Sequence, residues 1–176
     1  QAADGQVVAH VTTGADGTAR TSGLPLGSGA ATYAFVETKA PDGYVLDGTP
    51  HEFTVSTAGE QTSVVTVTVE AANEKNSLVV TKSELGSEET TLPGTEFAWW
   101  DADEGDDPAS ATSVRTLVVG DDGTLRVEGL APGDWHLVET RPVPGHLLDE
   151  TVRTVHVDEA GLVSGDWLVG GAHATA

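Results

Sequence analysis

The chain has 176 residues, with 28 acidic side chains against 8 basic ones and a formal net charge of −20 at neutral pH. Such a charge repels nucleic acids and anionic membrane surfaces, so we expect neither as a partner. The chain contains no Cys, which excludes disulfide scaffolds, thiol catalysis and Cys-based zinc sites.

Other patterns exclude further classes of protein. No apolar run approaches the roughly 20 residues that a membrane-spanning helix needs, and the N-terminus lacks the basic and apolar regions of a signal peptide. The His residues are scattered, and we find no hydrolase triad, nucleophile elbow or phosphate-binding loop. We therefore expect a protein that is not an enzyme and that uses no metal and no cofactor. Met is absent even from position 1, so we expect a piece of a longer protein.

Short runs of alternating apolar and polar residues recur along the chain, while helical periodicity is nearly absent. Period-two runs divided by Gly, Asp and Pro are typical of antiparallel sheets. Two Asp-Gly pairs predict hairpin turns, because Gly readily adopts the positive φ that such turns need. The runs cover residues 7–11, 52–55, 64–69, 115–119 and 153–157, and the turns are Asp16-Gly17 and Asp122-Gly123.

One segment of the chain is written twice. Residues 33–47 read YAFVETKAPDGYVLD, and residues 135–149 read WHLVETRPVPGHLLD, with a constant offset that continues into the following strands. Upstream, residues 16–24 match residues 122–130. A repeat on this scale indicates two copies of one structural unit.

A short polar stretch at residues 71–77 separates the copies. We place a first domain at residues 1–74 and a second at residues 75–176. The predicted fold class is all-β, with two tandem antiparallel β-sandwiches of the immunoglobulin-like or prealbumin-like kind.

The motif VETKAPDGY at residues 36–44 resembles the glutamate-bearing motif of the Cna-B-type domains, also called SpaA-like prealbumin-fold domains, of Gram-positive pilins and surface adhesins. The second copy keeps VET at residues 138–140 but then reads RPVPGH, so it resembles a divergent member. SLVVTK at residues 77–82 and LPGTEF at residues 92–97 resemble the first strand of the family and the loop into the second.

The resemblance implies a stalk module in which a Lys on the first strand forms an isopeptide bond with an Asn or Asp on the last strand, assisted by the motif Glu. Carried over to this chain, Lys82 is the amine and Glu139 its catalytic acid, while Glu37 is the acid and Asn73 the acceptor of the first copy. Burial between apolar sheets disfavours the charged forms, which would make the amine a nucleophile and keep the carboxyl protonated.

Each copy lacks one of the two residues that form the isopeptide bond in the family, and the missing residue differs between the copies. No first strand with a Lys precedes Val7, and the second copy stops at residues 173–176, before an Asn or Asp at the expected place. Asp166 is the nearest acid, but its turn-like surroundings argue against it. Three arrangements stay open: a fragment cut inside two domains, terminal strands supplied by a neighbour, or domains that fold without a crosslink.

The leading functional hypothesis is a structural stalk or backbone module of an extracellular, cell-wall-attached surface protein of a Gram-positive bacterium, a pilus shaft or an adhesin. Its partners would be neighbouring domains or subunits of the same surface protein, without membrane insertion of this chain. The alternative is an adhesin module that recognises a host protein or glycan.

The alternative depends on Trp100 or on the loop at residues 101–107, either of which could contact a host glycan or protein. Trp99 and Trp100 must point to opposite faces of a strand. We expect one in the core and the other half exposed, so that Trp100 is a candidate for ligand binding. Residues 101–107 (DADEGDD) also invite a calcium interpretation, but the Gly is misplaced for an EF-hand loop, and a solvated acidic loop is the simpler expectation.

Overall fold

The computed structural model describes residues 5–26, 29–56 and 66–167. The chain divides into two compact units: unit 1 contains residues 1–38 and 47–72, and unit 2 contains residues 39–46 and 73–176. The described elements are antiparallel strands and one short 3-10 helix, η1 (Ala102–Glu104), so the predicted all-β class is confirmed. Residues 39–46 lie before the predicted boundary at residues 74 and 75, and that boundary stays a prediction.

Unit 1 is organised around an antiparallel pair, β1 (Ala30–Phe35) and β2 (His51–Ser56). Tyr33 lies opposite Phe53 with ring centroids 5.9 Å apart, and Tyr33 is buried. Its hydroxyl donates a hydrogen bond to the carbonyl of Pro25, which ties the preceding loop to the pair. The strand predicted at residues 52–55 is confirmed.

Two predicted strands of unit 1 are not observed. Residues 7–11 form no strand, and the side chains of Val7, Val8 and Val11 are 49%, 39% and 43% exposed. The run at 64–69 lies partly outside the described residues, and its described part, residues 66–69, is also irregular. Alternation predicts a strand only where a neighbouring strand accepts the backbone hydrogen bonds, which the local pattern cannot guarantee.

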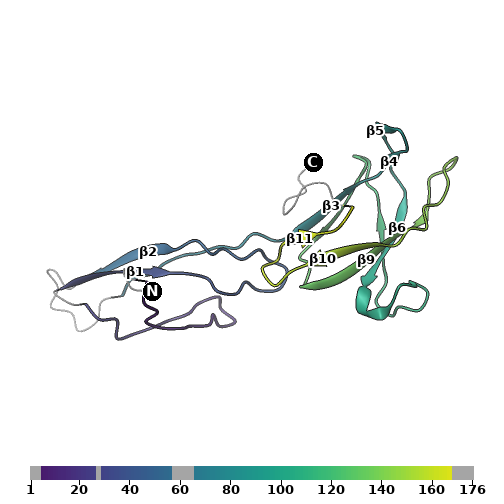
Figure 1. Cartoon of the computed structure of the whole chain (residues 1–176). Helices are drawn as coiled ribbons and strands as arrows, with labels where there is room; N and C mark the ends of the chain where they lie inside the picture. Colours follow the sequence, from purple (N-terminus) through teal and green to yellow (C-terminus); the bar gives the residue numbers. More distant parts are fainter. Residues whose placement is uncertain (1–4, 27–28, 57–65, 168–176) are drawn as a thin grey trace. The chain divides into compact units, whose positions relative to one another are not determined.

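Unit 2 is a β-sandwich. One layer is a five-stranded sheet in the order β11-β10-β9-β6-β7, and the other contains the pair β3-β8; β4 and β5 form a separate hairpin (Figure 1). The strands predicted at 115–119 and 153–157 appear as β7 and β10. The strands are β3 (Ser77–Thr81), β4 (Ser83–Glu84), β5 (Ser87–Thr91), β6 (Glu96–Asp101), β7 (Arg115–Val118), β8 (Thr124–Glu128), β9 (Gly133–Arg141), β10 (Arg153–Val157) and β11 (Val163–Ser164).

The core of unit 2 lies between its two layers. Alternate residues of each strand point inward, as the pleat requires, and together they form one buried apolar cluster. Its largest enclosed side chain is Trp99, whose ring stacks on Trp135 with centroids 5.5 Å apart. The buried members are Leu78, Phe97, Trp99, Val119, Leu125, Val127, Leu130, Leu137, Val155 and Val157.

The two predicted Asp-Gly turns have the same structure. Gly17 and Gly123 have φ of 73° and 77°, a left-handed conformation that side chains with a Cβ adopt at a cost. In each turn the Asp carboxylate accepts from the backbone N–H of the Thr two residues later, at 3.0 Å for Asp16 and 2.9 Å for Asp122. These hydrogen bonds lower the pKa of both carboxyls, with the largest effect from the Thr backbone N–H and the second largest from the Thr hydroxyl. The repeat in the sequence is therefore a repeat of local geometry.

Candidate functional site

Glu139 is a carboxylate on the core face of a central strand. It lies on β9, which is flanked by β10 and β6, and it is paired in register with Phe97. With a period of two, the side chain of Glu139 falls on the same face as that of Leu137, which belongs to the buried cluster. The pleat thus directs an acidic side chain into an apolar interior.

Lys82 approaches the same interior from the other layer. It follows β3, in which Leu78 and Val80 contribute to the core, and the same alternation turns Lys82 inward. Its backbone is held on both sides, since its N–H donates to Gly123 O at 3.0 Å and its C=O accepts from Leu92 N at 2.9 Å. The position of the ammonium is therefore set by two neighbouring segments.

The predicted amine and the predicted acid meet. Nζ of Lys82 lies 2.8 Å from Oε2 of Glu139, and the Glu139 side chain is 1% exposed against 24% for Lys82. Among the described residues, neither Glu139 oxygen accepts a well-directed hydrogen bond, so Lys82 is its principal polar neighbour. An enclosed carboxyl with spare hydrogen-bonding capacity is costly, and such groups are found where a function needs them.

A small cavity adjoins the ammonium. Its volume is about 120 Å³, and Lys82, Asp149, Arg153 and Trp167 contribute polar or aromatic groups to its wall. Val80, Thr81, Phe97 and Leu137 complete the lining. In the described part of the chain, β3 pairs only with β8, so the opposite edge of β3 is available beside this cavity.

Asp149 and Arg153 form an ion pair that sequence inspection did not single out. Arg153 Nη2 donates to Asp149 Oδ2 at 2.7 Å, and the Thr151 backbone N–H donates to Oδ1 at 3.1 Å. Hydrogen bonds from Thr151 and then Arg153 lower the pKa of Asp149 to about 2. The first copy has the same spacing in Asp47, Thr49 and His51, and that repetition was the available signal.

The predicted residues of the first copy are separated between the units. Glu37 belongs to unit 1, where Oε2 accepts a hydrogen bond from Asp47 N at 2.9 Å. Asn73 belongs to unit 2, where its Nδ2 donates to Val45 O at 3.1 Å. Their roles as acid and acceptor stay predictions.

The expectation that one Trp of the Trp99-Trp100 pair is half exposed is wrong. Trp99 is 1% exposed and Trp100 is fully buried. Trp100 does lie on the outer face of β6, but the loop that follows covers it: Nε1 donates to Gly105 O at 2.8 Å, and the ring meets His136 edge to face at 5.2 Å. Trp100 therefore has no exposed ring face for a ligand, and of the two features named for the adhesin alternative the loop at residues 101–107 remains.

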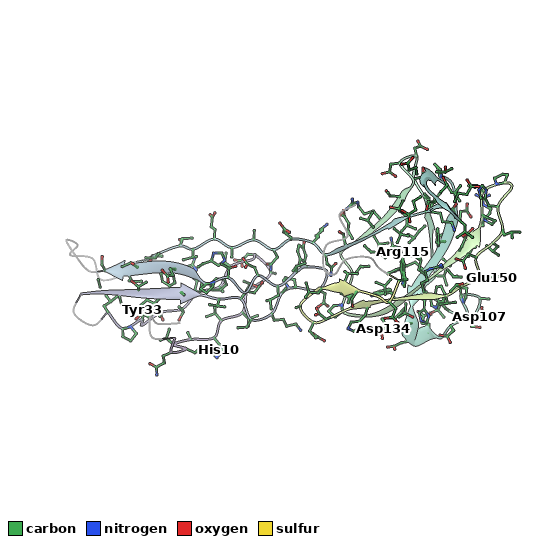
Figure 2. The ribbon with its side chains drawn as sticks, turned by 45° about the horizontal axis from the view of Figure 1, so that its top comes forward. His10, Tyr33, Asp107, Arg115, Asp134 and Glu150 are labelled. Carbon is green, nitrogen blue, oxygen red and sulfur yellow. The ribbon has the colours of Figure 1, made fainter. Side chains whose placement is uncertain are left out.

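The acidic loop at residues 101–107 is exposed at residues 103 and 105–107, as expected for a solvated loop, and hydrogen bonds connect it to the segment that follows. Glu104 binds the following segment, accepting hydrogen bonds from the backbone and hydroxyl groups of Thr112 and Ser113. These contacts lower the pKa of Glu104 to about 2, and the hydrogen bond from the Ser113 hydroxyl has the largest effect. Asp107, labelled in Figure 2, accepts from the Ala109 N–H at 2.9 Å. Among the described residues, no three acidic or His side chains are grouped to hold a metal ion.

The fold and the enclosed Lys-Glu pair define the class of protein: an all-β chain whose second unit is an antiparallel sandwich with a buried acid facing the end of its first strand. The family model of the SpaA prealbumin-like fold domain matches residues 1–73 and 76–167. The chain therefore belongs to the SpaA prealbumin-like fold domain family, and the resemblance seen in the motifs is confirmed.

Among solved structures, the Bacillus anthracis TIE protein is 27% identical over 86% of this chain, with a TM-score of 0.46. The pilus adhesin RrgA from Streptococcus pneumoniae is 18% identical over 53% of this chain, with a TM-score of 0.43. The chain spans 26% of the first protein and 11% of the second. No curated protein matches the chain. Within the described ranges, no helix has the length and apolar character to cross a membrane.

Proposed function

We propose that this chain is a stalk module of an extracellular surface protein, and that its second domain forms an isopeptide bond through Lys82 with Glu139 as the assisting acid. The observation that carries the proposal is the 2.8 Å contact between Lys82 Nζ and the enclosed Glu139 carboxyl. Membership of the SpaA family supports the same assignment, because residues 77–82 and 138–140 resemble the first strand and the glutamate motif of that family.

The proposed reaction needs a third group, the side-chain carbonyl of an Asn or Asp. Nζ of neutral Lys82 attacks that carbon, a C–N bond forms, and ammonia leaves from Asn or water from Asp. Glu139, as a neutral acid, donates a hydrogen bond to the carbonyl oxygen and carries the proton from the amine to the leaving group. The attack requires the neutral amine, because an ammonium has no lone pair on nitrogen to form the new bond.

The acceptor would lie on a strand beside the edge of β3 that adjoins the cavity. The predicted last strand at residues 173–176 lies outside the described residues. Asp166 is described and exposed, in a turn before Trp167, which supports the expectation that it is not the acceptor. In the first copy, Glu37 remains the proposed acid and Asn73 the proposed acceptor.

A bond between the first and last strands of a sandwich gives a stalk its mechanical strength. Tension applied to the two ends of a domain would otherwise be carried by hydrogen bonds, each of which contributes only about 1 kcal/mol net. A covalent link transfers that load to a bond that does not open under it. We propose attachment to a Gram-positive cell wall and assembly with neighbouring domains of the same protein as the setting for this function.

The test is the mass of the denatured chain. The 176-residue chain would be compared with a version extended at both ends by the first and last strands that the family pattern requires. Loss of one ammonia or water per domain in the extended version, abolished in the second domain by Lys82→Ala or Glu139→Ala, is the expected result. Full sequence mass in the folded extended version would overturn the isopeptide proposal and leave Lys82 and Glu139 as an ordinary ion pair.

A further inference from the structure

A segment of the first copy is built into unit 2. Residues 39–46 bond to the start of the second copy through their backbone: Gly43 O accepts from Asn76 N at 3.0 Å, and Val45 N donates to Glu74 O at 2.8 Å. Leu46 N donates to Ala160 O at 2.9 Å. The contacts use backbone groups on both sides, so they require a chain conformation more than a particular sequence.

The fit around this segment is close. A Cβ added at Gly43 would lie 3.0 Å from the backbone of Gly129, and one added at Gly161 would collide with the carbonyl of Tyr44. Gly43 is buried, and residues 44–46 are half buried. Glycines on both surfaces thus allow the two backbones to approach each other.

The second copy carries the corresponding segment at residues 141–148, in the same local conformation. Gly43 and Gly145 have φ of 86° and 91°. In both turns the residue after the Gly donates its N–H to the carbonyl oxygen three residues earlier. Tyr44 donates to Pro41 O at 3.1 Å, and His146 donates to Val143 O at 3.2 Å. Both segments therefore contain the same glycine turn, which in the first copy lies against the start of β3.

The surroundings of the two segments differ. Val45 and Leu46 are half buried, whereas their counterparts Leu147 and Leu148 are 95% and 42% exposed. The connection between β9 and β10 that carries them extends away from the sheet in Figure 1. His146 on this connection lies near the β4–β5 hairpin, with Nε2 4.0 Å from Glu84 Oε1. The second copy thus presents the same turn with its apolar pair exposed instead of covered.

We infer that residues 141–148 dock onto a further prealbumin-fold domain, in the way that residues 39–46 are built into unit 2. The occupant is a domain that offers an unfilled counterpart of the surface formed by residues 74–76, Gly129 and the turn at residues 158–161. In unit 2 that surface is filled by residues 39–46, so a second copy of this chain in the same state does not offer it. The inference rests on the proposed stalk function, because it needs domains in series, but not on the isopeptide bond.

The kind of partner is inferred from the backbone contacts that residues 39–46 make in unit 2, and not from the exposed Leu pair alone. The docked segment is recognised by backbone groups at the entry of the first strand and by two glycine turns, which are features of this fold. Because the turn at Gly145 is already formed, docking does not have to pay the ordering cost of a flexible loop.

The experiment extends the full chain by one further copy. At the offset of the repeat Ala176 corresponds to Glu74, so residues 75–176 would be appended directly after Ala176. Hydrogen exchange of the Leu147 and Leu148 amides would be compared between this chain and the 176-residue chain. We expect at least about tenfold slower exchange in the extended chain, because both amides gain carbonyl partners.

A matched pair of variants makes the result specific. Leu147→Asp places a charge at the docking surface and should abolish the slowing, whereas Val118→Asp, on the edge strand β7 and 54% exposed, should leave it intact. Equal exchange in the two unsubstituted chains, with the appended core amides protected, would overturn the inference. The isopeptide proposal is tested separately by the mass of the strand-extended chain, because in the present samples Thr175, and not an Asn or Asp, corresponds to Asn73 at the offset of the repeat.

A second measurement does not depend on the appended copy. In the 176-residue chain, Gly43→Val should displace residues 39–46, because the added side chain would collide with the backbone of Gly129. The surface that these residues cover is then open to residues 141–148 of another molecule. Sedimentation of the Gly43→Val chain should therefore show concentration-dependent association, and the double variant Gly43→Val, Leu147→Asp should show none. A Gly43→Val chain that stays monomeric with unit 2 folded would also overturn the inference.

Discussion

Asn76 and Leu130, 54 residues apart, exchange two hydrogen bonds: Asn76 Nδ2 donates to Leu130 O at 2.8 Å, and Leu130 N donates to Asn76 Oδ1 at 2.7 Å. Asn76 is buried, and its own backbone N–H donates to Gly43 O. Through its side chain and its backbone, one residue thus joins the entry of β3, the exit of β8 and the segment at residues 39–46. Sequence inspection considered Asn73 and missed Asn76, because nothing local distinguishes a buried Asn from a turn Asn.

Replacing Asn76 should destabilise unit 2 strongly. Asn76→Ala leaves the buried N–H and C=O of Leu130 without partners, and we expect a loss of about 2 to 4 kcal/mol in the free energy of unfolding. All four Trp residues lie at positions 99, 100, 135 and 167 in unit 2, so Trp fluorescence during urea unfolding reports this unit. Glu88→Ala, on the exposed face of β5, is the control. An unchanged urea midpoint would show that the two bonds contribute little.

Replacing Lys82 alone should lower the free energy of unfolding more than replacing both Lys82 and Glu139. In the uncrosslinked chain, Lys82→Met leaves an enclosed carboxyl without its cation, and we expect a loss of roughly 3 kcal/mol, the low end for a broken buried pair because Lys82 is partly exposed. Lys82→Met with Glu139→Gln should recover part of that loss. The measurement is a double-mutant cycle from urea unfolding, and strictly additive effects would contradict coupling of the two side chains.

The ion pair of Asp149 should make stability depend on pH in the acid range. Hydrogen bonds from Thr151 and Arg153 lower the pKa of Asp149 to about 2 in the folded state, against about 3.9 in an unfolded chain. The stabilisation is therefore complete above about pH 4 and is lost as the pH falls towards 2. Because the pair is partly exposed, its contribution is below about 1 kcal/mol.

The check is Asp149→Asn, with Glu150→Gln as the exposed neighbouring control labelled in Figure 2. The difference in unfolding free energy between Asp149→Asn and the parent chain should be present at pH 6 and vanish near pH 2, at roughly the pKa of the folded carboxyl. A difference that does not change with pH would assign the effect to packing instead of charge.

Glu104 should hold the loop that covers Trp100. Glu104→Ala removes the acceptor for the Thr112 and Ser113 amides, so we expect faster hydrogen exchange at both amides. Asp103→Ala, an exposed acidic residue in the same 3-10 turn, should leave these rates unchanged. Since the pKa of Glu104 is about 2, the parent chain should keep slow exchange at these amides down to about pH 3. Identical rates in Glu104→Ala and the parent would show that other contacts hold the loop.

The sequence by itself determined the all-β class, the family and the pairing of amine and acid in the second copy. Period-two alternation and Asp-Gly turns are local signals of the fold class, whereas Lys82 and Glu139 came from the resemblance of residues 77–82 and 138–140 to the first strand and the glutamate motif of the family. Alternation then places both side chains on the core face of their strands. The strands at residues 52–55, 115–119 and 153–157 were predictable for the same reason.

Only the tertiary structure decided what covers each face and which segments meet. Residues 7–11 alternate but form no strand, and Trp100 points outward from the sheet yet is buried by the loop that begins at Asp101. Residues 39–46 belong in sequence to the first copy and in space to unit 2. These outcomes depend on contacts between residues far apart in the chain, and the free energy of such contacts is absent from any local pattern of residues.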